Sequence, residues 1–185
     1  FSAVSPPDWY ALWVDLAYNV GLTSGVGGDC FAPERILTVA EAIQLAATLE
    51  SRYRADDVHL RSRQGGSWYS PAVDYCLASG ILRRGTLGPV DYGRPITRYE
   101  MVQLFAATTL ARDMPVVNSL ERMQELIPDV DRENPASGAV YELYAKGILA
   151  GTDGHRTFNG SGTVTRAEAA AIVSRMARAE QRLIL

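Results

Sequence analysis

Apolar residues recur at helical spacing along the chain in three pairs of segments. The first member of each pair covers about residues 9–20, 68–79 and 136–146. The aligned apolar columns, spaced i, i+3 and i+4, are Val14/Val73/Val140, Ala17/Cys76/Leu143 and Tyr18/Leu77/Tyr144. This spacing predicts amphipathic helices that each bury one stripe of side chains.

A glycine followed by an apolar residue marks the end of each of these helices. The three pairs are Gly21-Leu22, Gly80-Ile81 and Gly147-Ile148. Glycine tolerates the left-handed conformation that ends many helices, and an apolar residue after it packs back onto the last turn. The pattern therefore predicts a Schellman-type stop at all three places.

The second helix of each pair begins at a capping threonine. Thr38, Thr97 and Thr165 each stand three residues before a glutamate, and Thr-x-x-Glu before an apolar run predicts a capping box. The aligned apolar columns behind the caps are Ala42/Met101/Ala169, Leu45/Leu104/Ile172 and Ala46/Phe105/Val173. We expect these helices to run to about residues 54, 112 and 185.

This plan repeats along the chain. Trp9-Tyr10 and Trp68-Tyr69 are 59 residues apart, as are Thr38 and Thr97, and Thr165 follows after another 68. We predict an all-α fold of three helix–loop–helix units at residues 1–55, 56–113 and 114–185, called segments 1, 2 and 3 below. One such unit cannot bury its stripe alone, so the three are expected to pack into one body.

The linkers carry three further signals. Phe31, Val90 and Phe158 align within the loops of the three segments, and each is expected to pin its loop to the body. Residues 120–126 are amphipathic and predict an additional short helix. Cys76 shares a column with alanine and leucine, so we expect it to lie in the core.

Composition and motifs exclude several classes of function. A net charge of −3 and a pI near 5.4 argue against a nucleic-acid-binding surface, which is normally basic. No apolar run approaches the roughly 18 residues of a membrane-spanning helix. There is no Gly-x-Ser-x-Gly motif, phosphate-binding loop or Cys/His cluster at metal-ligand spacing, so we predict neither an enzyme nor a metal or cofactor site. Because residue 1 is Phe rather than Met, the sequence is expected to be a fragment or a processed product.

Two of the capped helices carry an arginine where helices disfavour one. Arg98 and Arg166 directly follow the capping threonines, where a cation faces the positive end of the helix dipole at a cost of roughly 0.3–1 kcal/mol. One explanation is an anionic ligand, because the free N–H groups of a first helical turn and a guanidinium fork both bind a carboxylate. The other is an ion pair with an Asp or Glu across the boundary to a neighbouring segment. The sequence leaves both explanations open.

Together, these motifs resemble the S-layer homology (SLH) domain over essentially the whole chain. The matching residues in segment 1 are Phe1-x-x-Val4, Trp9-Tyr10, Gly21-Leu22, Phe31-x-Pro33 and Thr38-x-x-Glu41. Segment 2 matches at Asp57-Val58, Trp68-Tyr69, Gly80-Ile81 and Thr97-Arg98-Tyr99-Glu100. Segment 3 matches at Ile127-Pro128-Asp129-Val130, Gly147-Ile148, Phe158 and Thr165-Arg166-Ala167-Glu168.

The resemblance implies a pseudo-threefold arrangement in which the second helices form a central three-helix bundle. Members of the family anchor proteins non-covalently to a secondary cell-wall polysaccharide of bacteria. Their ligand is typically a pyruvylated amino sugar held in grooves between adjacent repeats, and the arginine of Thr-Arg-Ala-Glu contacts it. By this resemblance the chain is an extracellular, monomeric module of the cell surface that uses no cofactor and binds through Arg98 and Arg166.

Six other residues are candidates for ligand contact, and each has a structural alternative. They are Asp57, Asp129, Trp9, Trp68, Gly25 and Gly151. The aspartates match groove positions of the family but can equally cap local turns. The tryptophans can offer faces to sugar rings or pack at the start of a helix. The glycines can let backbone amides approach a ligand or simply serve tight turns.

Departures from the family pattern argue against three equal sites. Val39 replaces the arginine in segment 1, where Ala3 also replaces an aspartate. Pro135 replaces the tryptophan in segment 3, and Tyr99 replaces an alanine in segment 2. The alternative function is therefore a degenerate SLH array that acts as a protein–protein interaction or structural spacer module.

Overall fold

The computed structural model describes residues 1, 4–56, 60, 66–84, 87 and 91–185. Within these residues it contains eight α-helices, one 3-10 helix (η1, Ala179–Gln181) and no strand, so the predicted all-α fold is confirmed. None of the helices in this described part is long and apolar enough to cross a membrane.

The paired helices lie where the hydrophobic pattern predicts them. The first helices are α1 (Ala11–Asn19), α3 (Ser70–Ala78) and α7 (Ser137–Ala145). The second helices are α2 (Val39–Arg54), α4 (Arg98–Ala106) and α8 (Arg166–Ala177). The additional helix predicted in the last linker is α6 (Leu120–Leu126).

The predicted capping boxes of the second helices and the glycine stops of the first helices are confirmed. At the starts of α2, α4 and α8 the threonine hydroxyl accepts the glutamate N–H and the glutamate carboxylate accepts the threonine N–H, which completes each capping box. Gly21, Gly80 and Gly147 follow the first helices with φ of +65°, +75° and +72°. After α1, the Leu22 N–H donates back to the Ala17 carbonyl at 2.8 Å, as a Schellman-type stop requires.

Two of the second helices are shorter than predicted. The expected run to residue 112 is wrong because the Thr108 hydroxyl caps a separate helix, α5 (Thr109–Asp113), after α4 has ended. The expected run to residue 185 is also wrong. Beyond α8 the chain turns through η1, and the Leu183 N–H donates to the Gly147 carbonyl at 2.9 Å instead of to a helical partner.

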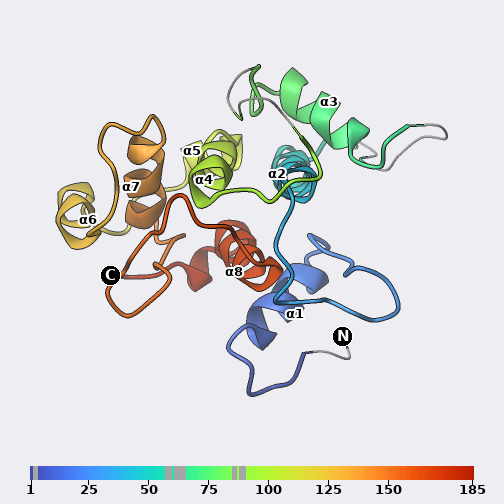
Figure 1. The fold of residues 1–185 in the computed structure, drawn as a ribbon, viewed down its shortest axis with the longest axis horizontal. Helices are drawn as coiled ribbons and strands as arrows, with labels where there is room; N and C mark the ends of the chain where they lie inside the picture. The colour runs from blue at the N-terminus through green and yellow to red at the C-terminus, as the bar shows by residue number, and fades with distance from the viewer. Residues whose placement is uncertain (2–3, 57–59, 61–65, 85–86, 88–90) are drawn as a thin grey trace.

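The second helices lie in the middle of the molecule and the first helices lie around them (Figure 1). Helix α2 contacts both α4 and α8, whereas α3 packs against α2, α7 against α4 and α1 against α8. The first helix of each segment therefore packs on the second helix of the preceding segment, and segment 1 packs on segment 3. Each segment thus contributes its two helices to two different junctions.

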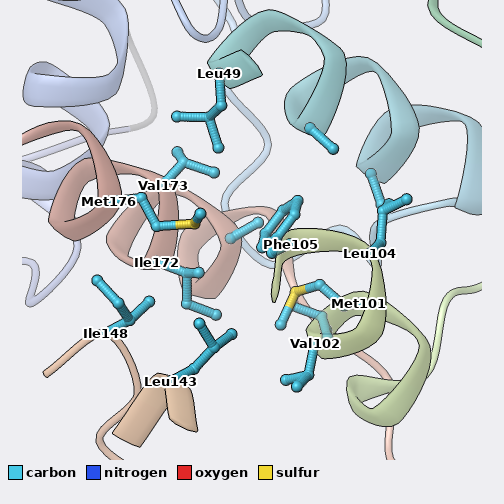
Figure 2. Close-up of a cluster of buried hydrophobic side chains, with 14 of the residues drawn as sticks. Leu49, Met101, Val102, Leu104, Phe105, Leu143, Ile148, Ile172, Val173 and Met176 are labelled. Carbon is cyan, nitrogen blue, oxygen red and sulfur yellow. The ribbon is translucent and has the colours of Figure 1, made fainter. Parts of the chain in front are cut away.

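The centre of the molecule is a continuous apolar core. Figure 2 shows Leu49 of α2, Phe105 of α4 and Ile172 and Met176 of α8 pointing toward one another, and all four are buried. The first two columns predicted for the first helices are buried as well: Val14, Val73, Val140, Ala17, Cys76 and Leu143. Burial raises the pKa of the Cys76 thiol to about 12, which is consistent with its predicted place in the core.

The third predicted column is wrong in two of its three members. Tyr18 and Leu77 are 53% and 44% exposed, whereas Tyr144 is fully buried. Helix α7 is additionally covered by α6, and Tyr144 packs edge-on against the Phe158 ring at a centroid distance of 6.4 Å. Phe31 and Phe158 are buried as predicted for the loop pins, while Val90 lies outside the described residues.

Candidate functional site

Backbone hydrogen bonds join the starts of α2, α4 and α8 in a cycle. The first two N–H groups of each helix donate to loop carbonyls of the next segment, at 2.9–3.0 Å. The pairs are Val39 and Ala40 to Arg94 and Tyr92, Arg98 and Tyr99 to Gly162 and Gly160, and Arg166 and Ala167 to Arg35 and Pro33. The following N–H is taken by the capping threonine. The expectation that these first turns offer free N–H groups to an anion is therefore wrong.

Arg98, at the first position of α4, reaches into segment 3. Its Nε donates to the Phe158 carbonyl at 2.6 Å, and its Nη1 pairs with the Glu168 carboxylate at 2.8 Å. Its Cζ lies 5.6 Å from the centroid of the Phe158 ring. The residue is only 3% exposed, so Arg98 forms the ion pair across a segment boundary that was one of the two explanations for its unusual place.

Arg166, at the first position of α8, makes the equivalent contacts with segment 1. Its Nε donates to the Phe31 carbonyl at 2.9 Å, its Nη1 lies 3.3 Å from the Glu41 carboxylate, and its Cζ lies 4.8 Å from the Phe31 ring centroid. Glu41 also pairs with Arg35, so two guanidinium groups share one carboxylate here. These three groups therefore carry one more positive charge than negative charge.

One donor of Arg166 is left over. Within the described residues its Nη2 is buried and has no hydrogen-bond partner. Burying an unpaired donor costs about 1–3 kcal/mol, and more where the donor is charged. Burial lowers the pKa of Arg166, while the neighbouring Glu41 acts against this shift. An additional acceptor at Nη2 would relieve the cost.

At the junction of segments 1 and 2, Arg94 is the residue that pairs with the capping glutamate, as Arg98 and Arg166 do at the other two junctions. It stands three residues before the capping Thr97 and holds the Glu100 carboxylate through two contacts of 2.6 and 2.9 Å. Burial alone would raise the pKa of Glu100, but hydrogen bonds from Arg94 and Thr97 outweigh it and lower the pKa. Arg35 occupies the matching place before Thr38. Sequence reasoning missed both arginines, although their shared offset from the cap was a usable signal.

A groove of about 1100 Å³ lies where segment 3 meets segment 1. Its walls are the end of α1 with the loop that follows, one face of α2 and the start of α8. It brings together Arg166 and Glu41, the side chain of Trp68 from segment 2, and the polar Gln44 and Thr48 of α2. All three segments therefore contribute to this groove, which we call the Arg166 groove.

Several of the residues that line the groove from α1 and α8 are small: Ala17, Ala169, Ala170 and Val173. All four are buried, and larger residues, Arg166 among them, line the groove as well. The aligned residues beside Arg98 are Leu143, Met101, Val102 and Phe105, all fully buried and gathered in one cluster (Figure 2). Tyr18 lines the groove with half its surface exposed, whereas the aligned Tyr144 is buried. Larger side chains thus fill at the Arg98 junction the space that is hollow at the Arg166 junction.

Of the two candidate aspartates, Asp129 has a different role from the arginines. Both carboxylate oxygens of Asp129 accept backbone N–H groups, from Phe158 and Asn159, each at 2.7 Å. Asp129 therefore holds the loop of segment 3 in place, which agrees with its alternative reading as a turn-stabilising residue. Asp57 lies outside the described residues.

The structural alternative for the two tryptophans was that they pack at the start of a helix, but both are largely exposed. Trp9 is 60% exposed and Trp68 is 50% exposed, and each ring stands nearly perpendicular to that of the following tyrosine. Of the two, Trp68 lines the Arg166 groove.

The two candidate glycines both have backbone conformations that favour glycine. Gly25 lines the groove with φ of +78°, and a Cβ there would stand 2.6 Å from the Phe1 ring and 2.7 Å from the Cys30 carbonyl oxygen. Gly151 has φ of +89°, and its Cβ would collide with the backbone of Arg156 at 2.6 Å. Gly151 is therefore explained by its turn alone, whereas Gly25 also borders the groove.

A second hollow of about 260 Å³ is lined mainly by apolar residues, among them Val20, Leu49 and Leu110. It includes neither Arg98 nor Arg166. Among the described residues, no group of His, Cys, Asp and Glu is arranged to hold a metal ion.

Comparison with known protein families identifies part of the chain. Residues 127–170 match the S-layer homology domain, a stretch that runs from the end of α6 into α8 and includes Asp129, Phe158 and Arg166. A search of curated proteins finds no match. The family match indicates a cell-wall anchoring module of the cell surface, a binding rather than a catalytic role. The tandem repetition of this domain through segments 1 and 2 stays a prediction.

Proposed function

We propose that this chain holds a surface protein on the bacterial cell wall by binding a pyruvylated secondary cell-wall polysaccharide in the Arg166 groove. In this proposal residues 1–55, 56–113 and 114–185 are three SLH repeats that share one pseudo-threefold body. The module is extracellular and monomeric, and its partner is a polysaccharide that carries a pyruvylated amino sugar.

The observation that carries the proposal is the unpartnered Nη2 of Arg166, a residue that lines the groove and shares Glu41 with Arg35. A ketal-linked pyruvate presents one carboxylate, which supplies the missing acceptor and a charge-assisted hydrogen bond worth about 1.5–3 kcal/mol. Because Arg166 and Arg35 share Glu41, one added negative charge brings this cluster to neutrality.

Arg98 is not an equivalent site in this proposal. Its guanidinium is held by Phe158 and Glu168 as a one-to-one ion pair, and Met101, Val102 and Phe105 occupy the neighbouring space. Segment 1 has Val39 at the corresponding place. We therefore expect one ligand per chain at saturation.

The test is co-sedimentation with purified pyruvylated wall polysaccharide, beside the same polysaccharide after mild acid has removed its pyruvate. The wild type is expected to sediment with the first and remain in solution with the second. Arg166→Ala should lose binding at least tenfold, the effect of one lost contact of about 1.4 kcal/mol or more. Arg98→Ala, which removes a comparable buried guanidinium, should keep its binding as long as it is folded.

A second variant protects this test against misfolding. Ala170→Met leaves the Arg166 ion pair in place but adds bulk to the groove wall, so it should lose binding while keeping its helical circular dichroism spectrum. Equal binding by wild type, Arg166→Ala and Ala170→Met would contradict the proposed site.

The alternative is a structural spacer or protein-interaction module. One observation favours this alternative: at all three junctions an arginine already pairs with a capping glutamate, namely Arg94, Arg98 and Arg166. A wild-type chain that sediments with none of several pyruvylated polysaccharides would favour this alternative over anchoring.

A further inference from the structure

We propose that Trp68 is a stacking surface for a second sugar residue, so that the Arg166 groove binds a stretch of polysaccharide rather than a single pyruvylated sugar. This inference rests on the proposed function and adds the length of ligand that the groove recognises. It assigns the anionic sugar to Arg166 and a neighbouring neutral sugar to Trp68.

The size of the groove supports more than one sugar residue. Its volume of about 1100 Å³ lies at the upper end of ordinary small-molecule pockets, which run to about 1000 Å³. Along α2 the lining extends from Glu41 to Arg52. At a rise of 1.5 Å per residue this face is about 16 Å long, more than one pyranose ring covers.

Trp68 is held in place but left half exposed. Its ring stands 5.6 Å from that of Tyr69 at 84°, and Tyr69 in turn stacks on Tyr92 at 4.6 Å. Tyr69 and Tyr92 both pack against the core, so they support the indole from within. An aromatic ring fixed by such packing presents apolar area at a low entropic cost on binding, which suits the C–H face of a sugar ring.

The groove also offers uncharged polar groups between its charged residues. Gln44 and Thr48 lie one helical turn apart on α2, and Ser51 lies a further turn along. The Thr48 hydroxyl donates to the Gln44 carbonyl and the Ser51 hydroxyl donates to the Asp56 carbonyl. The lone pairs of these hydroxyls and the Gln44 amide can still exchange hydrogen bonds with sugar hydroxyl groups. Neutral sugars are therefore suitable occupants of this part of the groove.

Trp9 provides a matched control within the same chain. It also precedes a tyrosine, its ring lies 5.6 Å from Tyr10 at 80°, and it is 60% exposed. It is not among the residues that line the Arg166 groove. A contribution from Trp68 but not from Trp9 would therefore come from the groove rather than from the Trp-Tyr motif or from an exposed indole.

The experiment is isothermal titration with two probes, a pyruvylated N-acetylhexosamine monosaccharide and a trisaccharide fragment that carries the same pyruvylated sugar. The wild type is expected to bind the trisaccharide more tightly. Trp68→Ala should remove that advantage, a loss of roughly tenfold, and leave the monosaccharide affinity unchanged. Trp68→Phe should retain most of the advantage, and Trp9→Ala should behave like the wild type with both probes.

Two results would overturn the inference while leaving the proposed function intact. In the first, Trp68→Ala binds the trisaccharide as tightly as the wild type. In the second, Trp68→Ala weakens both probes equally, which would place Trp68 on the pyruvylated sugar itself. A wild type that binds neither probe would overturn the proposed function and this inference together.

Discussion

The junctions at Arg98 and at Arg166 are built from the same parts and yet differ in what they leave open. At both, an arginine after a capping threonine donates to a loop carbonyl, lies near a phenylalanine ring and pairs with the capping glutamate of the next segment. The aligned side chains are buried at both junctions, but beside Arg98 they are large, whereas beside Arg166 they are small and border a groove. The motif therefore builds a junction, and the residues around the motif decide whether a ligand can enter.

The largest expected effect is on the free energy of unfolding, which should fall more for Arg98→Ala than for Arg166→Ala. Arg98→Ala should lower the free energy of unfolding by about 3–5 kcal/mol, because it removes two charge-assisted hydrogen bonds of about 1.5–3 kcal/mol each, to the Phe158 carbonyl and to the Glu168 carboxylate. Arg166→Ala should cost less, since Glu41 keeps Arg35 as a partner. Urea unfolding followed by circular dichroism measures both values. An equal loss from the two substitutions would show that Arg35 does not compensate.

The next effect compares substitutions at two aligned positions, Met101 beside Arg98 and Ala169 beside Arg166. Met101→Ala should destabilise the chain by about 2–4 kcal/mol, because it opens a cavity at a position with no exposed surface. Ala169 at the aligned position is also buried but borders the groove, so Ala169→Met should cost only about 1 kcal/mol, the low end of overpacking, because its side chain can extend into the groove. The same urea titration compares them. A similar cost for both would mean that the Arg166 groove is not open in solution.

The smallest effect concerns the third junction and depends on pH. The pKa of Glu100 is lowered from its ordinary value of about 4.5, so its pairing with Arg94 stabilises the fold above that pH and is lost as the pH falls through the lowered pKa. Arg94→Gln should therefore cost about 1 kcal/mol or less at pH 7, because the pair is partly exposed, and less at pH 3 than at pH 7. Unfolding curves at the two pH values check this. Arg35→Gln is the matched control and should cost less at pH 7, because Glu41 also pairs with Arg166.

The elements that sequence analysis predicted best are those with local signals. The capping boxes at Thr38, Thr97 and Thr165 and the glycine stops are made by residues within a few positions of one another, so their spacing alone identifies them. The end of α4 was missed because Thr108 looked like one more helical residue, although threonine can cap a new helix as well.

The site depends on contacts that no local pattern records. Arg166 and Glu41 are 125 positions apart, and their pairing follows from segment 1 packing on segment 3. Whether Ala169 and Ala170 line a groove depends on the side chains that face them across the junction, and the sequence shows only that they are small. The two readings of the arginines could be stated from the sequence, but only the fold shows that the ion pair is formed.

The dependence of segment 1 on segment 3 has a consequence for synthesis of the protein. Helix α1 packs on α8, and the carbonyls of Arg35 and Pro33 accept the first N–H groups of α8. During synthesis α1 is made before α8, so the face of α1 that packs on α8 stays uncovered until segment 3 has followed. A product that stopped before α8 would keep this face of α1 uncovered, which makes it a target for proteolysis rather than a smaller working module.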